Sequence, residues 1–173
     1  MRIKTLIILC LLVLFFSCKK DQGSNTGDNT GNEENKEITA KDISKIDYIE
    51  FALDLKAENA IKDWQQYYEL QEVVTNIKKG DLSFFNDNKE VINTLLKELK
   101  TSIPKEINAP SILVRITALE TKLYKLESLL NLSTTSKKEH IATIKDFLVA
   151  FSSLNLQINK KMEFDTRKIE KPE

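Results

Sequence analysis

The chain has 173 residues, of which 26 are basic and 26 are acidic, and 41% of all residues are apolar. This length and apolar fraction suit one globular domain and exclude a wholly disordered or collagen-like chain. Because the opposite charges balance and are spread along the sequence, we expect no surface for a nucleic-acid partner.

The first eighteen residues differ from the rest of the chain. Arg2 and Lys4 form a basic start, residues 6–16 are apolar without a break, and Ser17 and Cys18 follow. This is the layout of a signal peptide. Even residues 5–18 would extend only about 21 Å as a helix, against about 30 Å of bilayer hydrocarbon. The segment is therefore too short to span a membrane comfortably.

A small residue followed by Cys18 directly after the apolar run resembles the lipobox of bacterial lipoproteins. The resemblance covers residues 1–18 only, and it departs from the usual pattern at Phe15 and Phe16, where the family more often has Leu and then a small residue. It implies cleavage between Ser17 and Cys18, followed by attachment of lipid to the sulfur and the new amino group of Cys18. The alternative is an ordinary Cys18 thiol after a generic cleaved signal or in an uncleaved anchor.

The resemblance also bears on location. Several acyl chains anchor a protein stably in a membrane. Lys19 follows the cysteine, whereas an Asp there favours the inner membrane in this family, so we expect the outer membrane and leave open which face. The other cysteine, Cys10, lies inside the signal peptide, so no disulfide is expected in the mature domain.

Four segments are expected. Residues 1–17 form the signal peptide, and residues 18–37 combine the lipidated cysteine with a polar, glycine-containing tether that has no packed structure. Residues 38–165 form the domain, and residues 166–173 form a charged tail.

Within the domain, apolar residues recur at intervals of three and four, which predicts helices throughout. A first helix of about forty residues is expected from the cap at Thr39, with Ile38 and Ile43 packed across it, to a left-handed cap at Gly80, with a kink near residues 57–60. A second helix is expected over residues 87–103.

The last two predicted helices have the most regular patterns. Residues 108–130 carry a seam of the type that joins helices at a shallow angle, made of Ile112, Ile116, Leu119, Leu123, Leu126 and Leu130. The last helix is expected over residues 136–162 and begins with a cap at Ser136. We expect an all-α fold in which four amphipathic helices, the first of them long, close into an antiparallel bundle.

The scarcity of histidine and glycine in the sequence excludes several kinds of site. His140 is the only histidine and Gly80 the only glycine after residue 31, so di-iron, zinc and haem sites and glycine-rich phosphate loops are not expected. We therefore assign no catalytic residue, metal or cofactor. A hydrolase that uses two converging carboxylates is the weakest hypothesis, because the sequence cannot show such convergence.

Two features predict recognition on the first helix. Acidic residues recur at intervals of three and four at Asp47, Glu50, Asp54 and Glu58, and the aromatic residues Trp64, Tyr67 and Tyr68 follow. The simpler explanation of the acidic residues is a solvated helix face. The simpler explanation of the aromatic residues is core packing, with Tyr67 exposed. The residues proposed for partner binding are Glu50, Asp54, Glu58, Trp64, Tyr67 and Tyr68.

Two functional hypotheses follow from the sequence. The first is a membrane-anchored, non-enzymatic helical module that binds another envelope protein or has a structural role. The second is a small-molecule or lipid binder with an apolar pocket inside the bundle, lined by Trp64, Tyr68, Phe147 and Phe151.

Overall fold

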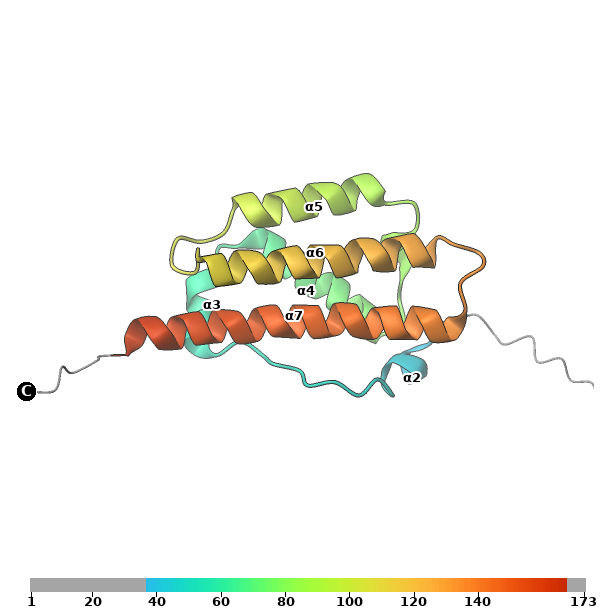
Figure 1. Ribbon diagram of the computed structural model, residues 1–173, viewed down its shortest axis with the longest axis horizontal. Coiled ribbons are helices and arrows are strands. Elements are labelled where there is room, and N and C mark those ends of the chain that lie inside the picture. The colour runs from blue at the N-terminus through green and yellow to red at the C-terminus, as the bar shows by residue number, and fades with distance from the viewer. Residues whose placement is uncertain (1–36, 168–173) are drawn as a thin grey trace, which may run out of the picture. The chain divides into compact units, whose positions relative to one another are not determined.

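The structure is a computed structural model that describes residues 37–167 (Figure 1). Within these residues the chain forms helices joined by turns and no strand, so the prediction of an all-helical fold is confirmed. The signal peptide, Ser17, Cys18, the tether up to residue 36 and the tail from residue 168 lie outside the described residues.

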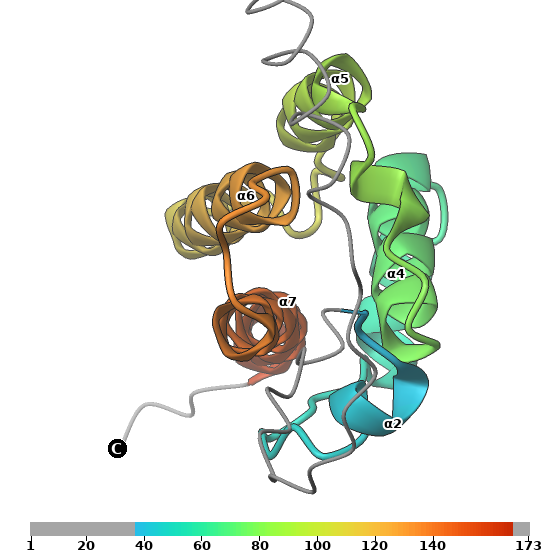
Figure 2. The same cartoon turned by 90° about the vertical axis from the view of Figure 1, so that its right-hand side faces the viewer.

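Four helices of thirteen or more residues enclose the core. The elements are α2 (Ala40–Ile43), α3 (Leu55–Ile61), α4 (Gln65–Lys78), the 3-10 helix η1 (Ser83–Phe85), α5 (Lys89–Thr101), α6 (Pro110–Leu130) and α7 (Lys137–Thr166). In the end view of Figure 2, α6 and α7 lie on one side of the core, α4 lies opposite them, and α5 lies above.

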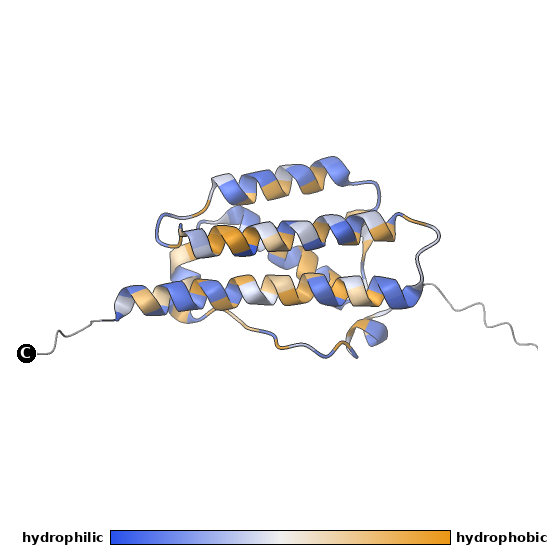
Figure 3. Ribbon diagram, viewed as in Figure 1, coloured by the Kyte–Doolittle hydropathy of each residue, from blue (hydrophilic) through white to orange (hydrophobic). Residues whose placement is uncertain are grey.

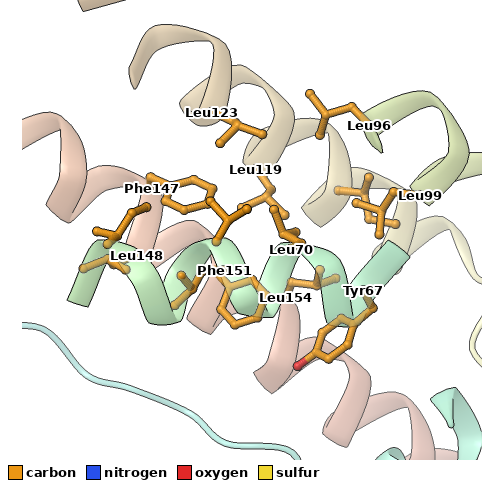
Figure 4. Packing of buried hydrophobic residues seen from close by; sticks show 14 of the residues in the cluster. Tyr67, Leu70, Leu96, Leu99, Leu119, Leu123, Phe147, Leu148, Phe151 and Leu154 are labelled. Carbon is orange, nitrogen blue, oxygen red and sulfur yellow. The ribbon is translucent and has the colours of Figure 1, made fainter. Parts of the chain in front are cut away.

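The core is apolar and draws on all four of these helices. Figure 4 shows Leu70 of α4 near Leu119 of α6, and Tyr67 of α4 on the side of Phe151 and Leu154 of α7, together with buried residues of α5. Along the ribbon, hydrophobic and hydrophilic residues alternate with the helical repeat (Figure 3). The fold therefore rests on apolar stripes that the helices bury against one another.

The predictions for α6 and α7 agree closely with the structure. Five seam residues of α6, from Ile112 to Leu126, are fully buried, and Leu130 is half-buried. Pro110 occupies the first turn, where its missing N–H costs nothing. Ser136 accepts a hydrogen bond from the Glu139 amide at the start of α7, which continues to Thr166.

The predicted long first helix is wrong. The Thr39 cap is present, with Ile38 and Ile43 buried, but α2 ends at Ile43. Residues 46–54, which we call the strap, have no regular secondary structure and run along the domain to α3. A further turn at residues 62–63 separates α3 from α4.

Asp54 provides a physical reason for this break. Its carboxylate accepts hydrogen bonds from the amides of Lys56 (2.9 Å) and Ala57 (2.8 Å), which makes it the N-cap of α3. Asp is poor inside a helix and strong at its start. A continuous helix would also have placed Glu50, Asp54 and Glu58 four residues apart, where like charges destabilise it.

Gly80 ends α4 as predicted, and it also contacts α2. Its φ of +82° lies in the left-handed region that favours glycine. A Cβ at this position would lie 2.6 Å from the Ala40 nitrogen. The glycine therefore serves both the end of α4 and the close approach of the Thr39–Ala40 backbone.

Candidate functional site

One face of α7 holds the strap through side-chain hydrogen bonds. The Ser152 hydroxyl accepts from the Phe51 amide (2.8 Å) and donates to the Ile49 carbonyl (2.8 Å). One turn further on, Asn155 donates through Nδ2 to the Phe51 carbonyl (3.0 Å). These side chains satisfy strap backbone groups that helix formation would otherwise have paired.

Asn159 continues the same stripe of α7. Its Nδ2 donates to the Ala52 carbonyl (2.8 Å), and its Oδ1 accepts from the Asp54 amide (3.0 Å). Residues 152, 155 and 159 are three and four positions apart, so they share one helix face. We call Ser152, Asn155 and Asn159 the polar clamp.

Asn155 also joins the clamp to α4. The Tyr67 hydroxyl donates to Asn155 Oδ1 at 2.9 Å, and both side chains are buried. Burial raises the pKa of Tyr67, with smaller contributions from Tyr68 and Glu58. The phenol therefore stays protonated and keeps donating this hydrogen bond across the whole neutral range.

An ion pair fixes the strap to α4. Glu50 pairs with Lys78, and the Tyr48 hydroxyl donates to the other Glu50 oxygen at 3.3 Å. Partial burial opposes the charged form of Lys78, but the Glu50 carboxylate and Tyr48 outweigh it and raise the pKa of Lys78. The strap is thus bonded to α7 and to α4.

A cavity of about 290 Å³ lies between the strap, α4 and α7. Four of the residues predicted for partner binding line it, namely Glu50, Glu58, Tyr67 and Tyr68. The structure therefore brings part of the predicted set together, although on a strap and two helices instead of one long helix. Phe151, predicted to line a ligand pocket, is also part of its wall.

The other predicted residues have structural positions. Asp54 caps α3 as described, and Trp64 is 1% exposed, with its indole Nε1 donating to Ser102 Oγ at 3.1 Å. Phe147 is fully buried in the core. The expectation that Tyr67 is the exposed aromatic residue is wrong, because Tyr67 is buried and Tyr68 is 41% exposed.

The register of α4 explains this exchange. Tyr67 shares a helix face with Leu70, Val74 and Ile77, all of them buried, whereas Tyr68 lies one residue off that face. Tyr67 stacks on Trp64 and on Phe151, with ring centroids 5.7 and 5.6 Å apart.

A second hollow, about 620 Å³ in volume, lies between α4 and α5 on another part of the surface. We call it the α4–α5 groove. Its apolar lining consists of Val73, Phe84, Val91 and Leu95, and its charged lining of Glu69, Glu72, Glu90 and Glu98. No Lys or Arg is among the residues of the described range that line it.

Two further features of the described residues concern metal-ligating side chains and helices that could cross a membrane. No three His, Cys, Asp or Glu side chains gather there as metal ligands. The His140 ring lies 3.0 Å from the Leu129 carbonyl at the connection between α6 and α7. Helix α7 is long and apolar enough to cross a membrane by length and composition, and half of its most apolar stretch is buried inside the domain.

Sequence reasoning missed the polar clamp and the α4–α5 groove. The sequence does contain a signal for the clamp, because the polar residues Ser152, Asn155 and Asn159 interrupt the apolar pattern of α7 at helical spacing. The groove had a weaker one, because its acids come from two helices whose contact only the fold defines.

Comparisons of the chain with protein-family models, with curated proteins and with solved structures found no match.

Proposed function

We propose that this chain is a lipid-anchored envelope lipoprotein whose helical domain binds another envelope protein and catalyses no reaction of its own. The observation that carries the binding proposal is the α4–α5 groove, a hollow of about 620 Å³ with an apolar floor and a charged rim. Surface regions of this composition mark interaction sites in monomeric domains.

Exposed apolar area in the groove supports this surface. Val91 is 53% exposed and Phe84 is half-buried, whereas Leu95 is 5% exposed. A partner that covered Val91 and Phe84 would remove apolar area from water at a gain of about 25 cal/mol per Å².

In this proposal α4, α5, α6 and α7 act as an antiparallel four-helix bundle that keeps the groove walls in place. The two ends of the α4–α5 pair support the arrangement. Gln66 near the start of α4 bonds with Ser102 after the end of α5 (2.8 Å), and η1 joins the end of α4 to the start of α5.

The membrane anchor of this proposal rests on the lipobox resemblance. Lipid on Cys18 would hold the protein at the membrane, with the outer membrane favoured by Lys19, and the polar tether would let the domain reach its partner. Cys18→Ser is expected to move the protein from the membrane fraction to the soluble fraction. Unchanged membrane association of this variant would contradict lipid anchoring.

A pair of matched valine variants tests the binding surface. Val91→Arg places a bulky cation in the groove, and Val114→Arg changes another exposed valine (65%, against 53% for Val91) on α6. After crosslinking in cells, we expect one envelope protein to be captured by the wild type and by Val114→Arg but not by Val91→Arg. Equal capture by both variants would place the binding surface elsewhere.

A small-molecule site is a second candidate, favoured by the cavity under the strap. Its wall combines the aromatic Tyr68 and Phe151 with Glu58, Gln71 and Asn155, as small-ligand sites combine apolar walls with a few polar groups. Native mass spectrometry of the purified full chain tests it. A stoichiometric small molecule that is lost from Tyr68→Ala would support it, and a bare protein mass would count against it.

A further inference from the structure

The charge of the α4–α5 groove indicates what kind of partner it accepts. Glu69 and Glu98 accept hydrogen bonds from Gln65 and Gln66, at 2.7 and 3.4 Å. Glu72 and Glu90 form no ion pair within residues 37–167. Four carboxylates thus line one hollow, and no Lys or Arg of residues 37–167 forms an ion pair with them, so an incoming partner with positive charge is favoured.

The apolar floor separates this groove from a purely acidic surface. Val91 and Leu95 are four residues apart on α5, and Val73 faces them from α4. A free metal ion or a polyamine would gain nothing from these side chains. The combination fits a partner that carries an apolar stripe between flanking cations.

The length of the groove agrees with two turns of a helix. Glu90 and Glu98, its outermost α5 residues, are eight positions apart, which corresponds to about 12 Å at 1.5 Å rise per residue. Both walls are helices whose backbone groups are already paired, so the groove offers side-chain contacts only. A helix, which satisfies its own backbone, suits such a groove better than an extended strand does.

We propose that the α4–α5 groove binds an amphipathic helix of a partner protein, with apolar residues seated on Val73, Val91 and Leu95 and with Lys or Arg residues facing Glu69, Glu72, Glu90 and Glu98. This inference rests on the proposed protein-binding function and specifies the partner segment. It goes beyond that function by requiring both an apolar stripe and positive charge.

Three synthetic peptides of eighteen residues test the proposal with the full chain, purified in a non-ionic detergent. The first has leucines at positions i, i+3, i+4 and i+7 between lysines, the second replaces the lysines with Glu, and the third keeps the composition of the first but scrambles the stripe. Fluorescence anisotropy measures each affinity at low and at physiological salt. We expect the first peptide to bind best, and more weakly as salt is added.

The matched protein variants are Glu72→Gln/Glu90→Gln in the groove and Asp47→Asn/Glu106→Gln on exposed sites outside its lining. Each exposed ion pair contributes up to about fivefold in affinity, so the loss of two should make the groove variant bind the first peptide about two- to twenty-five-fold more weakly. The control variant should match the wild type.

Several results would overturn the inference. Equal binding of the lysine and Glu peptides would remove the charge requirement, and equal binding of the scrambled peptide would leave only polycation binding. Self-association of the chain that is lost in Val91→Arg would make a second copy the occupant. If a photo-crosslinking amino acid at position 91 captures a partner in cells while no peptide binds, the proposed function stands and the proposal of a basic helical partner is wrong.

Discussion

The α6–α7 pair and the α4–α5 pair are both made of amphipathic helices, yet they differ in what they leave exposed. The seam of α6 buries Ile112, Ile116, Leu119, Leu123 and Leu126 completely against its neighbours. Between α4 and α5, a hollow remains in which Val91 is 53% exposed and four carboxylates gather. The first pair is therefore scaffold, whereas the second has the composition of a recognition surface.

The strap adds a third kind of packing to this comparison. Its backbone is held by the polar clamp of α7 instead of by its own helix. Buried polar side chains stabilise a fold only when all their partners are present. Among the described residues no buried side-chain polar atom lacks a partner, so the clamp meets this condition.

The largest expected effect lies in the α6–α7 scaffold. Leu119→Ala removes a fully buried side chain between α6, α4 and α7, and should lower the free energy of unfolding by about 3 kcal/mol. Urea unfolding followed by circular dichroism measures this change. Val114→Ala, at an exposed position on the same helix, is the control and should change stability by less than about 0.5 kcal/mol. A similar effect of both variants would contradict the scaffold role.

The next largest effect concerns the polar clamp. Asn155→Ala leaves the Phe51 carbonyl and the buried Tyr67 hydroxyl without their hydrogen-bond partner and should cost about 2 kcal/mol. Amide hydrogen exchange should accelerate in the strap, residues 46–54, more than in α6. Unchanged exchange of the strap amides in this variant would show that the clamp does not hold it.

The sequence predicted α6 and α7 but not the strap. Helices α6 and α7 followed from apolar periodicity because Ser136, Pro110 and the seam act locally. The strap did not, because the hydrogen bonds that favour it over a helix come from residues 152–159, about one hundred positions away. Isoleucines and leucines at helical spacing in residues 46–53 therefore indicated a helix that tertiary contacts replace.

The candidate site was predicted only in part, for a related reason. The sequence identified Glu50 and Glu58 in one feature of the first helix and Tyr67 and Tyr68 in another, and the structure brings all four to the cavity under the strap. The α4–α5 groove depends on which faces of two helices meet, and a one-residue error in the register of α4 exchanged Tyr67 and Tyr68. The spacing of residues along the sequence determines neither the faces on which two helices meet nor the exact register of α4.

A smaller, pH-dependent effect is expected in α2, which precedes the strap. Asp42 accepts a hydrogen bond from the Lys137 ammonium (2.8 Å) and from the Thr39 hydroxyl and amide, and these contacts hold the pKa of Asp42 below its usual range. A depressed folded-state pKa stabilises the fold above the unfolded value, near 3.9, and this contribution is lost as pH falls further.

Asp42→Asn should therefore be less stable than the wild type at neutral pH, by less than Asn155→Ala is. The difference should shrink as pH falls below about 4, which thermal unfolding across a pH series measures. Asp47→Asn, at an exposed position, is the control. A difference that stays constant down to pH 2 would contradict the role of the Asp42 charge.

The smallest effect on stability is expected in the α4–α5 groove. Glu72→Gln/Glu90→Gln changes exposed side chains without ion pairs, so the free energy of unfolding should shift by less than about 0.5 kcal/mol, toward higher stability as repulsion is relieved. Urea unfolding measures it. A loss above 1 kcal/mol would mean that these carboxylates serve the fold instead of a partner.

Recognition through the α4–α5 groove is tested most directly by a photo-crosslinking amino acid placed at Val91 in the full chain in living cells. The same residue placed at Val114 on α6 is the matched control, because both valines are largely exposed. We expect a crosslinked envelope protein from position 91 and none, or a different pattern, from position 114. The account would be contradicted if both positions captured the same protein, or if position 91 captured none.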